Sequence, residues 1–325
     1  MKETILKAVN ETRKIIEYGI RSEFLSIDYM PLYMFTTENI KGVTESLDVY
    51  GKDVFTVCAS SDHEFNFLLK GARNVEAFDV NYLTDFYYWF KESAILTLEY
   101  EEFIDFFFPK HKFSFRKKTF NEKDFMRIID NIRDEDAKEY WKNLVAIYGC
   151  EFLYSSKLFN IFYDKKLYIE CNDYLKNKEN YNKLRDRLKS HNHKFYHLNI
   201  FSELSGMPKD KKYQVIYLSN ILNRINSKDE LSCVKKIKEI IERFKLYLTK
   251  DGIFGICYLY CYLDEQHIKY APNNILNPDL RREYFPDSKD IPNSEYSYPS
   301  FNGFNDPKGE SRLLKNMDAV MVIKK

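Results

Sequence analysis

The chain has 325 residues, which suits one large domain or one domain with a sizeable insertion. A core of that size holds a fold without disulfides or a structural metal. The 50 basic and 49 acidic residues nearly cancel, and this balance argues against a dedicated nucleic-acid binder, which usually carries a net basic face.

Apolar residues at helical spacing over 2–20 predict an N-terminal helix, the start of a lead-in that spans residues 1–50. This beginning carries charges throughout, so it does not have the apolar core of a signal peptide. No later apolar run reaches the length of a membrane span. We therefore expect a cytoplasmic protein without a transmembrane segment.

A βαβ unit follows the lead-in. DVFTVCA at 53–59 is apolar and β-branched and predicts a buried strand. The next segment predicts a helix, with Ser61 as N-cap, Glu64 completing a capping box and Gly71 ending it. NVEAFDVN at 74–81 predicts a second strand, and the unit implies that the two strands are parallel.

Strand patterning is then lost over residues 82–194. We expect a long, aromatic, helical stretch over 82–108, two helices within 120–149 and a further helix over 181–192. The order of elements predicts that this stretch is a helical insertion that covers the binding cleft.

Strands return after the insertion, with one amphipathic helix among them that Gly252 should close. The expected strands lie at 194–200, 212–220, 253–263 and 316–325, and the expected helix at 235–252. The fold class is therefore α/β, a Rossmann-like doubly wound sheet with a helical insertion. Residues 51–81 and 195–325 would form the cofactor-binding domain.

The six cysteines are scattered, without a C-x-x-C pair or the ligand spacing of a zinc site. They are Cys58, Cys150, Cys171, Cys233, Cys257 and Cys261. Such spacing indicates reduced, buried thiols in a cytosolic protein. Among the histidines, His193 and His197 flank a predicted strand but have no third ligand in sight, so no metal site is expected.

Ligands of open α/β sheets bind beyond the carboxyl ends of the strands, which directs attention to Asp79. It ends the second predicted strand, 20 residues after Ala59. A carboxylate there can accept hydrogen bonds from ribose hydroxyls, although D-x-N is also ordinary turn chemistry.

The loop from Ala59 to Asn66 has no glycine, so it suits a pyrophosphate badly and argues against a nicotinamide dehydrogenase. S-adenosylmethionine has no phosphates, and its carboxylate could meet the helix N-terminus. A plain capped helix is the alternative. His63 is expected to be a solvated surface residue, and the EYEE run at 99–102 a solvated helix face.

These stretches together resemble the S-adenosylmethionine:diacylglycerol 3-amino-3-carboxypropyl transferase family, enzymes of betaine-lipid synthesis, and its bacterial relatives. The similar segments are VFTVCASSDHEFNFLLKGARNVEAFDVN, KESAILTLEYEEFIDFF, SSKLF, NDYLKNKENYNKLRDRL and YQVIYLSNIL. The resemblance implies a class I methyltransferase-like fold. It also implies S-adenosylmethionine as cofactor.

The resemblance also implies roles for individual residues. Ser60, Ser61 and Asp62 would lie near the amino-acid end of the cofactor, and Asp79 on its ribose. Asn199 and Ile200 would flank the adenine, and Ser219 and Asn220 would face the reacting centre. The expected cofactor-binding residues are Ala59, Ser60, Ser61, Asp62, Asp79, Val80, Asn199, Ile200, Ser219 and Asn220. The candidate bases are Asp62, His63 and His197. Relatives usually carry a glycine in an S-G-D-type loop where this chain has Ser61, which leaves open a relative that has lost activity.

The predicted function is transfer of the 3-amino-3-carboxypropyl group from S-adenosylmethionine to a hydroxyl of a lipid or other small molecule. Methyl transfer from the same cofactor is the alternative, and a non-catalytic relative that keeps the fold is the third interpretation. A lipid acceptor would bring transient membrane contact. No nucleic-acid partner is expected, and the sequence leaves the oligomeric state open.

Overall fold

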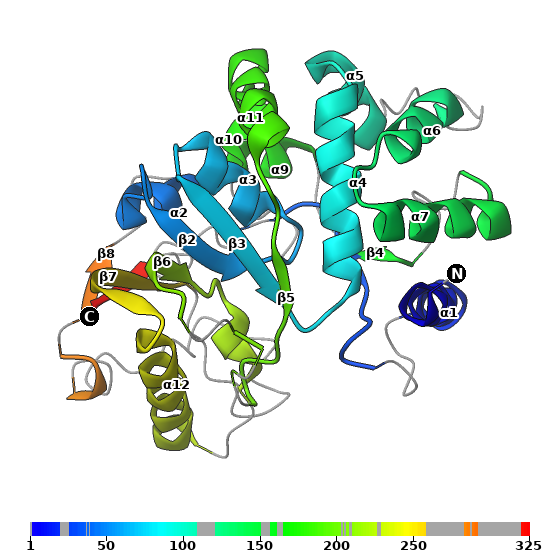
Figure 1. Cartoon of the computed structure of the whole chain (residues 1–325). Coiled ribbons are helices and arrows are strands. Elements are labelled where there is room, and N and C mark those ends of the chain that lie inside the picture. Colours follow the sequence, from blue (N-terminus) through cyan, green and yellow to red (C-terminus); the bar gives the residue numbers. More distant parts are fainter. Residues whose placement is uncertain are drawn as a thin grey trace, which may run out of the picture. The chain divides into compact units, whose positions relative to one another are not determined.

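The structure is a computed structural model in which the chain forms two compact units (Figure 1). The first comprises Met1–Glu38, Cys58–Leu69 and Ala77–His197, and the second Asn39–Val57, Lys70–Glu76 and Leu198–Lys325. The structure describes residues 2–19, 26–36, 38, 40–108, 121–150, 157–160, 165–202, 204, 206–207, 210–225, 229–257, 283–286, 288–291 and 320–325.

Seven strands form a mostly parallel sheet in the order β5-β3-β2-β6-β7-β9-β8. Their bounds are β2 Asp53–Val57, β3 Asn74–Asp79, β5 Phe195–His197, β6 Tyr213–Tyr217, β7 Leu248–Cys257, β8 Ser288–Ile291 and β9 Val320–Lys324. The pairs β3–β5, β2–β6 and β6–β7 are parallel, whereas β9 runs antiparallel to β7 and to β8. Within this sheet the strand earliest in sequence, β2, lies inside the order, which reverses there as in doubly wound sheets. The predicted Rossmann-like α/β fold is confirmed.

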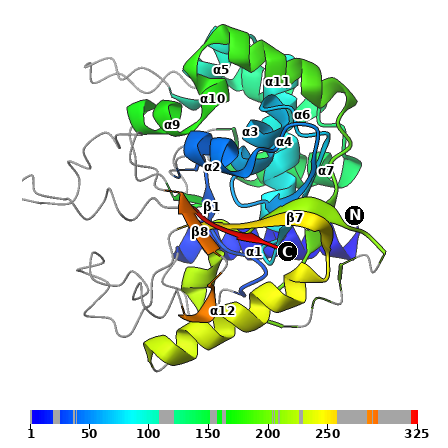
Figure 2. The ribbon, with the colours of Figure 1, turned by 90° about the vertical axis from the view of Figure 1, so that its left-hand side faces the viewer.

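Two helices cover the strands of the second unit. In both views α2 (Ile40–Leu47) and α12 (Glu230–Lys245) lie on opposite faces of the strands (Figures 1 and 2). α12 packs on β7, and α2 packs on β9. The apolar face of α12 supplies the buried side chains Val234, Ile237 and Ile241.

The expected helix end at Gly252 is wrong. α12 ends at Lys245, and β7 begins at Leu248. The register with β6 shifts between Tyr213 and Val215, so β7 is irregular there. A Cβ at Gly252 would lie 3.0 Å from the Leu248 side chain and from the Thr249 carbonyl oxygen. The glycine therefore serves a close approach within an irregular strand rather than a helix end.

The first unit is mainly helical. Its helices are α1 Glu3–Tyr18, α3 Asp62–Leu69, α4 Leu83–Thr97, α5 Tyr100–Phe107, α6 Glu122–Asp130, α7 Glu135–Tyr148, α9 Lys165–Cys171, α10 Asp173–Lys176 and α11 Lys178–Ser190. A two-stranded parallel sheet joins β1 (Leu32–Tyr33) to β4 (Phe159–Asn160). The central helix is α4, which packs against α5, α6, α7 and α11 (Figure 1). Aromatic rings fill these contacts, for example Phe90 against Trp141 with ring centroids 4.6 Å apart.

The aromatic helical stretch expected over 82–108 consists of two helices, α4 and α5. The chain leaves α4 at Leu98, which is extended, and Glu99 starts α5. Glu99 and Glu102 form a capping box, in which each side chain accepts from the backbone N–H of the other. The acidic run at 99–102 therefore starts a helix, and its three glutamates are exposed there, as expected from the sequence.

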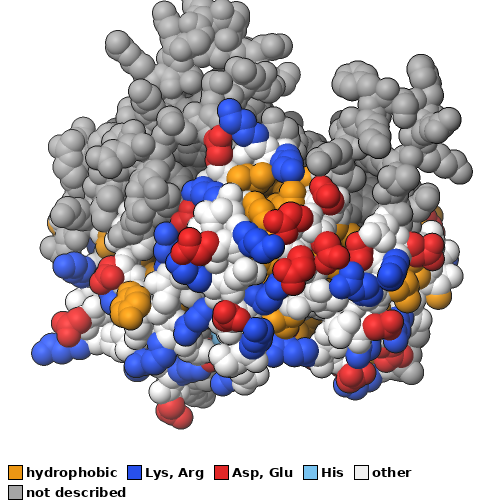
Figure 3. Space-filling model, turned by 90° about the horizontal axis from the view of Figure 1, so that it is seen from above, with side chains coloured by type: hydrophobic (Ala, Val, Ile, Leu, Met, Phe, Trp, Pro, Cys, Tyr) orange, Lys and Arg blue, Asp and Glu red, His pale blue; other side chains and the backbone are white. Residues whose placement is uncertain are grey.

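Acidic and basic side chains are interspersed on the described part of the face seen in Figure 3. Within the part of the chain that the structure describes, no helix combines the length and the apolar character needed to cross a membrane.

Candidate functional site

The turn between β2 and α3 holds two residues other than glycine in left-handed conformations. Ala59 has φ 45° and Ser61 has φ 69°, each at a cost of about 1–3 kcal/mol that the surroundings must offset. The Cys58 N–H donates to the Phe78 carbonyl at 2.7 Å, and the Ser61 N–H donates to the Cys58 carbonyl at 2.6 Å. These bonds fix the turn against the end of β3.

Asp79 ends β3 and holds the same turn. Its Oδ2 accepts from the Ala59 N–H and its Oδ1 from the Asn81 N–H, both at 3.0 Å. Burial raises the pKa of Asp79, and the hydrogen bonds from backbone N–H groups oppose that rise. A carboxylate oxygen can accept two hydrogen bonds, so each of the two retains capacity for a ligand donor. Asp79 is 8% exposed.

The capping box expected at the start of α3 is not formed. The hydroxyl of Ser61 is buried without a hydrogen-bond partner among the described residues. Glu64 does not reach back to cap the helix but accepts hydrogen bonds from two histidines. The polar side chains of α3 face the interior of the first unit, where an unpaired group would be costly.

Asp62 is fully buried in a network of four donors. Its Oδ1 accepts from Lys91 Nζ at 2.5 Å and from the Tyr174 hydroxyl at 2.6 Å. Its Oδ2 accepts from the Ser60 hydroxyl at 2.8 Å and from the Thr36 N–H at 2.5 Å. Two hydrogen bonds at each oxygen occupy its acceptor capacity.

Lys91 brings a buried cation beneath the turn. Besides its bond to Asp62, its Nζ donates to the Ser60 carbonyl at 2.7 Å and lies 4.2 Å from the centre of the Phe35 ring. Burial lowers the pKa of Lys91 to about 8, although the neighbouring carboxylate favours the charged form. The hydrogen bonds of Lys91 to Asp62 and Ser60 therefore hold the turn against α4.

His63 is buried, with 1% exposure, so the expected surface position is wrong. Its Nε2 lies 2.9 Å from Glu38 Oε2. The sequence did not reveal this pairing because the two residues are 25 positions apart and Glu38 lies outside the βαβ unit.

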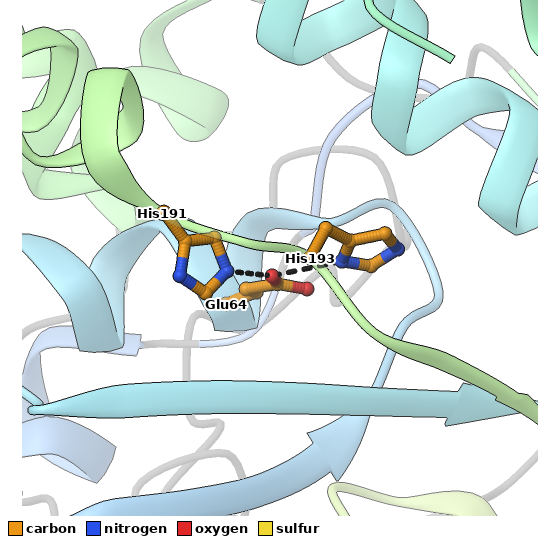
Figure 4. A group of neighbouring side chains, drawn as sticks. All are labelled: Glu64, His191 and His193. Atoms are coloured by element: carbon orange, nitrogen blue, oxygen red, sulfur yellow. Dashed lines mark hydrogen bonds and ion pairs between the residues drawn. The ribbon is translucent and has the colours of Figure 1, made fainter. Parts of the chain in front are cut away.

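Glu64, the next residue of α3, contacts two histidines that follow α11. Figure 4 shows His191 and His193 flanking Glu64, with Oε1 at 2.7 Å from His191 Nε2 and 2.9 Å from His193 Nδ1. His193 Nε2 lies 3.2 Å from Asp85 Oδ1. Burial lowers the pKa of His193, but Glu64 and Asp85 outweigh it and raise the pKa to about 10. Burial raises the pKa of Glu64, but the histidines outweigh it and hold the pKa below its usual value.

His197 lies at the end of β5, beside Asp79, with which it is paired in the sheet register. Its side chain is 31% exposed. Its Nε2 is 2.8 Å from the Val80 carbonyl oxygen, and its ring stacks on Tyr82 with centroids 3.7 Å apart. A carbonyl only accepts, so Nε2 carries the proton, and in the neutral ring Nδ1 is the acceptor.

The other four predicted residues belong to the second unit. Asn199 Oδ1 accepts from the Phe201 N–H at 3.0 Å, and Ile200 is 1% exposed. Ser219 follows β6 with φ 55°, a left-handed conformation like that of Ser61, and Asn220 is exposed. Their part in binding a cofactor stays a prediction.

Sequence reasoning missed Lys91, which lies in an aromatic helical stretch, and Tyr174, which lies among polar residues between the expected helices. It also considered His193 with His197 and expected no metal site, whereas the structure groups His193 with His191 around Glu64. The signal that could have found this group is the H-x-H spacing at 191–193, since residues two apart in an extended segment can approach one carboxylate.

No protein-family model and no curated protein matches the chain. Two solved structures of the rRNA methyltransferase aviRa from Streptomyces viridochromogenes are similar to it at 10% and 9% identity, with TM-scores of 0.30 and 0.32. They cover 66% and 73% of this chain and 70% and 82% of their own. A possible exported protein from Bordetella parapertussis is similar at 8% identity and TM-score 0.37, over 98% of this chain and 79% of its own. At such values the function must be argued from the residues.

Proposed function

We propose that the chain is an S-adenosylmethionine-dependent transferase whose first unit binds the cofactor at the turn after β2. The observation that carries the proposal is the carboxylate of Asp79, which is fixed by the Ala59 and Asn81 N–H groups and retains acceptor capacity on both oxygens. Two such oxygens match the two hydroxyls of a ribose.

The turn fits this cofactor better than a dinucleotide. It reaches left-handed conformations at Ala59 and Ser61 without glycine, so Cβ atoms stand where a pyrophosphate would need bare backbone. S-adenosylmethionine presents no phosphate there. The buried Ser61 hydroxyl, which has no partner among the described residues, is a donor available to the carboxylate of its amino-acid portion.

His197 is the base that the geometry favours among the three candidates. The acceptor capacity of Asp62 is occupied by four donors, and His63 is buried against Glu38. His197 is partly exposed beside Asp79, and its Nδ1 can accept the proton of an acceptor hydroxyl. Bound S-adenosylmethionine would supply a carbon activated by its sulfonium.

The group transferred is proposed to be 3-amino-3-carboxypropyl, on the strength of the sequence resemblance. Attack at the methylene of the amino-acid chain breaks its bond to sulfur and leaves methylthioadenosine. Attack at the methyl leaves S-adenosylhomocysteine. The two reactions therefore differ in their adenosine product.

The test is to incubate the protein with S-adenosylmethionine and a cell extract, and to separate the adenosine products by chromatography. We expect enzyme-dependent methylthioadenosine above a no-enzyme control, which is needed because the cofactor slowly yields this product alone. S-adenosylhomocysteine as the sole product would replace the proposal by methyl transfer. If neither product forms with any of several extracts, the result would favour a non-catalytic protein.

Two variants test the base. His197→Ala should lower the turnover rate by 10²–10⁴-fold, the usual contribution of a general base. His63→Gln removes an imidazole from the same unit and should leave more of the rate. Equal losses in the two variants would contradict the role of His197.

A further inference from the structure

Glu64, His191 and His193 bring one carboxylate and two imidazoles together in the interior of the first unit. Their ligand atoms all lie within 4.8 Å of one another. The carboxylate comes from α3, and the histidines come from the segment after α11, so the group joins parts of the chain that are 127 residues apart. Figure 4 shows both rings directed at the same carboxylate oxygen.

The group is more than a hydrogen-bonded cluster, because one donor atom in it is unused. Glu64 Oε1 takes both contacts, while Oε2 is buried without a hydrogen-bond partner among the described residues. Glu64 is 0% exposed. A buried carboxylate oxygen without a partner is costly, so it points to a ligand that would occupy it.

A second layer of residues orients His193. Its Nε2 faces Asp85 at 3.2 Å, and its ring stacks on Tyr88 with centroids 3.5 Å apart and planes 9° apart. Metal-binding histidines typically direct their second nitrogen to a carboxylate in this way, which fixes the ring and leaves the other nitrogen for the ion.

We propose that Glu64, His191 and His193 form a binding site for a divalent transition-metal ion, with Asp85 as the residue that positions His193. Two imidazoles and one carboxylate suit Zn²⁺ and its neighbours in the first transition row, whereas Mg²⁺ and Ca²⁺ take oxygen ligands. The second oxygen of Glu64 is the donor available for a fourth position.

Metal binding would replace the protons shared within the group. The carboxylate and imidazole atoms now lie 2.7 and 2.9 Å apart, which are hydrogen-bond distances. Around Zn²⁺, with bonds of about 2.0–2.1 Å, neighbouring ligand atoms would stand about 3.3 Å apart. Glu64 Oε1 would therefore separate from each imidazole nitrogen by about half an ångström, and the two nitrogens, which lie within 4.8 Å of each other, would adopt the same spacing.

The burial assigns the ion a structural role. The side chains of Glu64, His191 and His193 are 0, 4 and 1% exposed, which leaves no path for a substrate to reach the ion directly. An ion there would tie the start of α3, next to the proposed cofactor turn, to the end of α11. This inference does not depend on the proposed cofactor.

The experiment is a calorimetric titration of Zn²⁺ into chelator-treated full-length protein, followed by the same titration with Co²⁺. Wild type should bind one ion tightly, and the visible spectrum of the Co²⁺ form should indicate nitrogen and oxygen ligands. Glu64→Gln and His191→Ala should weaken this binding by more than 100-fold. Asp85→Asn, which alters only the positioning residue, should weaken it by about 10–100-fold.

His63→Gln is the matched control, because His63 is also a buried histidine of α3 beside a glutamate. It should bind one ion with wild-type affinity, and circular dichroism should show that every variant is folded. Absence of tight binding in folded wild type would overturn the proposal. So would an unchanged affinity in folded Glu64→Gln and His191→Ala, which would place the ion at cysteines or surface histidines. If wild type binds Zn²⁺ but does not bind S-adenosylmethionine, the result would contradict the proposed function and leave the metal site supported.

Discussion

Replacing Lys91 with Met tests whether the buried pair with Asp62 holds the turn after β2. Both side chains are 0% exposed, with Nζ 2.5 Å from Oδ1. Removal of one partner of a buried pair costs about 3–5 kcal/mol, because the remaining charge is left uncompensated. Asp62 would keep its bonds from Tyr174, Ser60 and Thr36, so we expect a loss near the lower limit, about 3 kcal/mol.

The assay is urea denaturation followed by circular dichroism. With a slope of about 3 kcal/mol/M, a loss of about 3 kcal/mol lowers the urea midpoint by about 1 M. The double variant Asp62→Asn/Lys91→Met removes the stranded charge, so it should recover about 2 kcal/mol relative to Lys91→Met alone.

The control is Lys189→Met, the same substitution in an exposed pair with Asp186, where the side chains are 63 and 70% exposed. It should change the stability by less than about 0.5 kcal/mol. A loss below about 1 kcal/mol for Lys91→Met, or a double variant no more stable than the single one, would refute the reasoning.

Two further predictions concern the same turn. The pKa of Lys91 is about 8 in the folded protein and 10.5 in the reference state, so the unfolded chain binds more protons between these values and stability rises with pH there. The free energy of unfolding of wild type, measured by urea denaturation, should rise relative to that of Lys91→Met by on the order of 3 kcal/mol from pH 7 to pH 10.5. A difference in stability between the two proteins that does not change with pH would contradict the burial argument. Ser61 has φ 69°, so Ser61→Val should lower stability by about 1–3 kcal/mol, whereas Ser61→Gly should change it by less than about 1 kcal/mol. Thermal unfolding of the two variants distinguishes these effects. Equal changes in both variants would show that the backbone at Ser61 is unstrained.

The sheet could be predicted because its strands are short apolar runs, which are too short for buried helices and therefore favour strands. Val54, Phe55 and Val75 are fully buried, and such β-branched and aromatic runs bounded by polar turns favour strands. The end of α12 could not be predicted, because the helical periodicity of the sequence continues past Lys245. In the structure Leu248 instead pairs with Tyr213 of β6 and belongs to β7. Tertiary pairing overrode local propensity there.

The candidate site was predictable where it depends on local order. The sequence placed Asp79 at the end of its strand beside the turn that starts at Ala59, and the structure has it there, bonded to the Ala59 N–H. The partners of α3 were not predictable, because Lys91, Tyr174 and His191 lie 29, 112 and 127 residues from the side chains they contact. A local rule suggested a capping box for Glu64, but burial of α3 on every side turned this carboxylate to the histidines.

The most direct test of the central claim is a calorimetric comparison of S-adenosylhomocysteine with an analogue that lacks both ribose hydroxyls. Wild type should bind the former at one site and the latter about 10–100-fold more weakly, since charge-assisted hydrogen bonds contribute about 1.5–3 kcal/mol. Asp79→Ala should bind both ligands with the same, weak affinity, because its loss removes the acceptor of those hydroxyls. If wild type binds neither ligand at millimolar concentration, or if the hydroxyls contribute equally in both proteins, the assignment of Asp79 and its cofactor is contradicted.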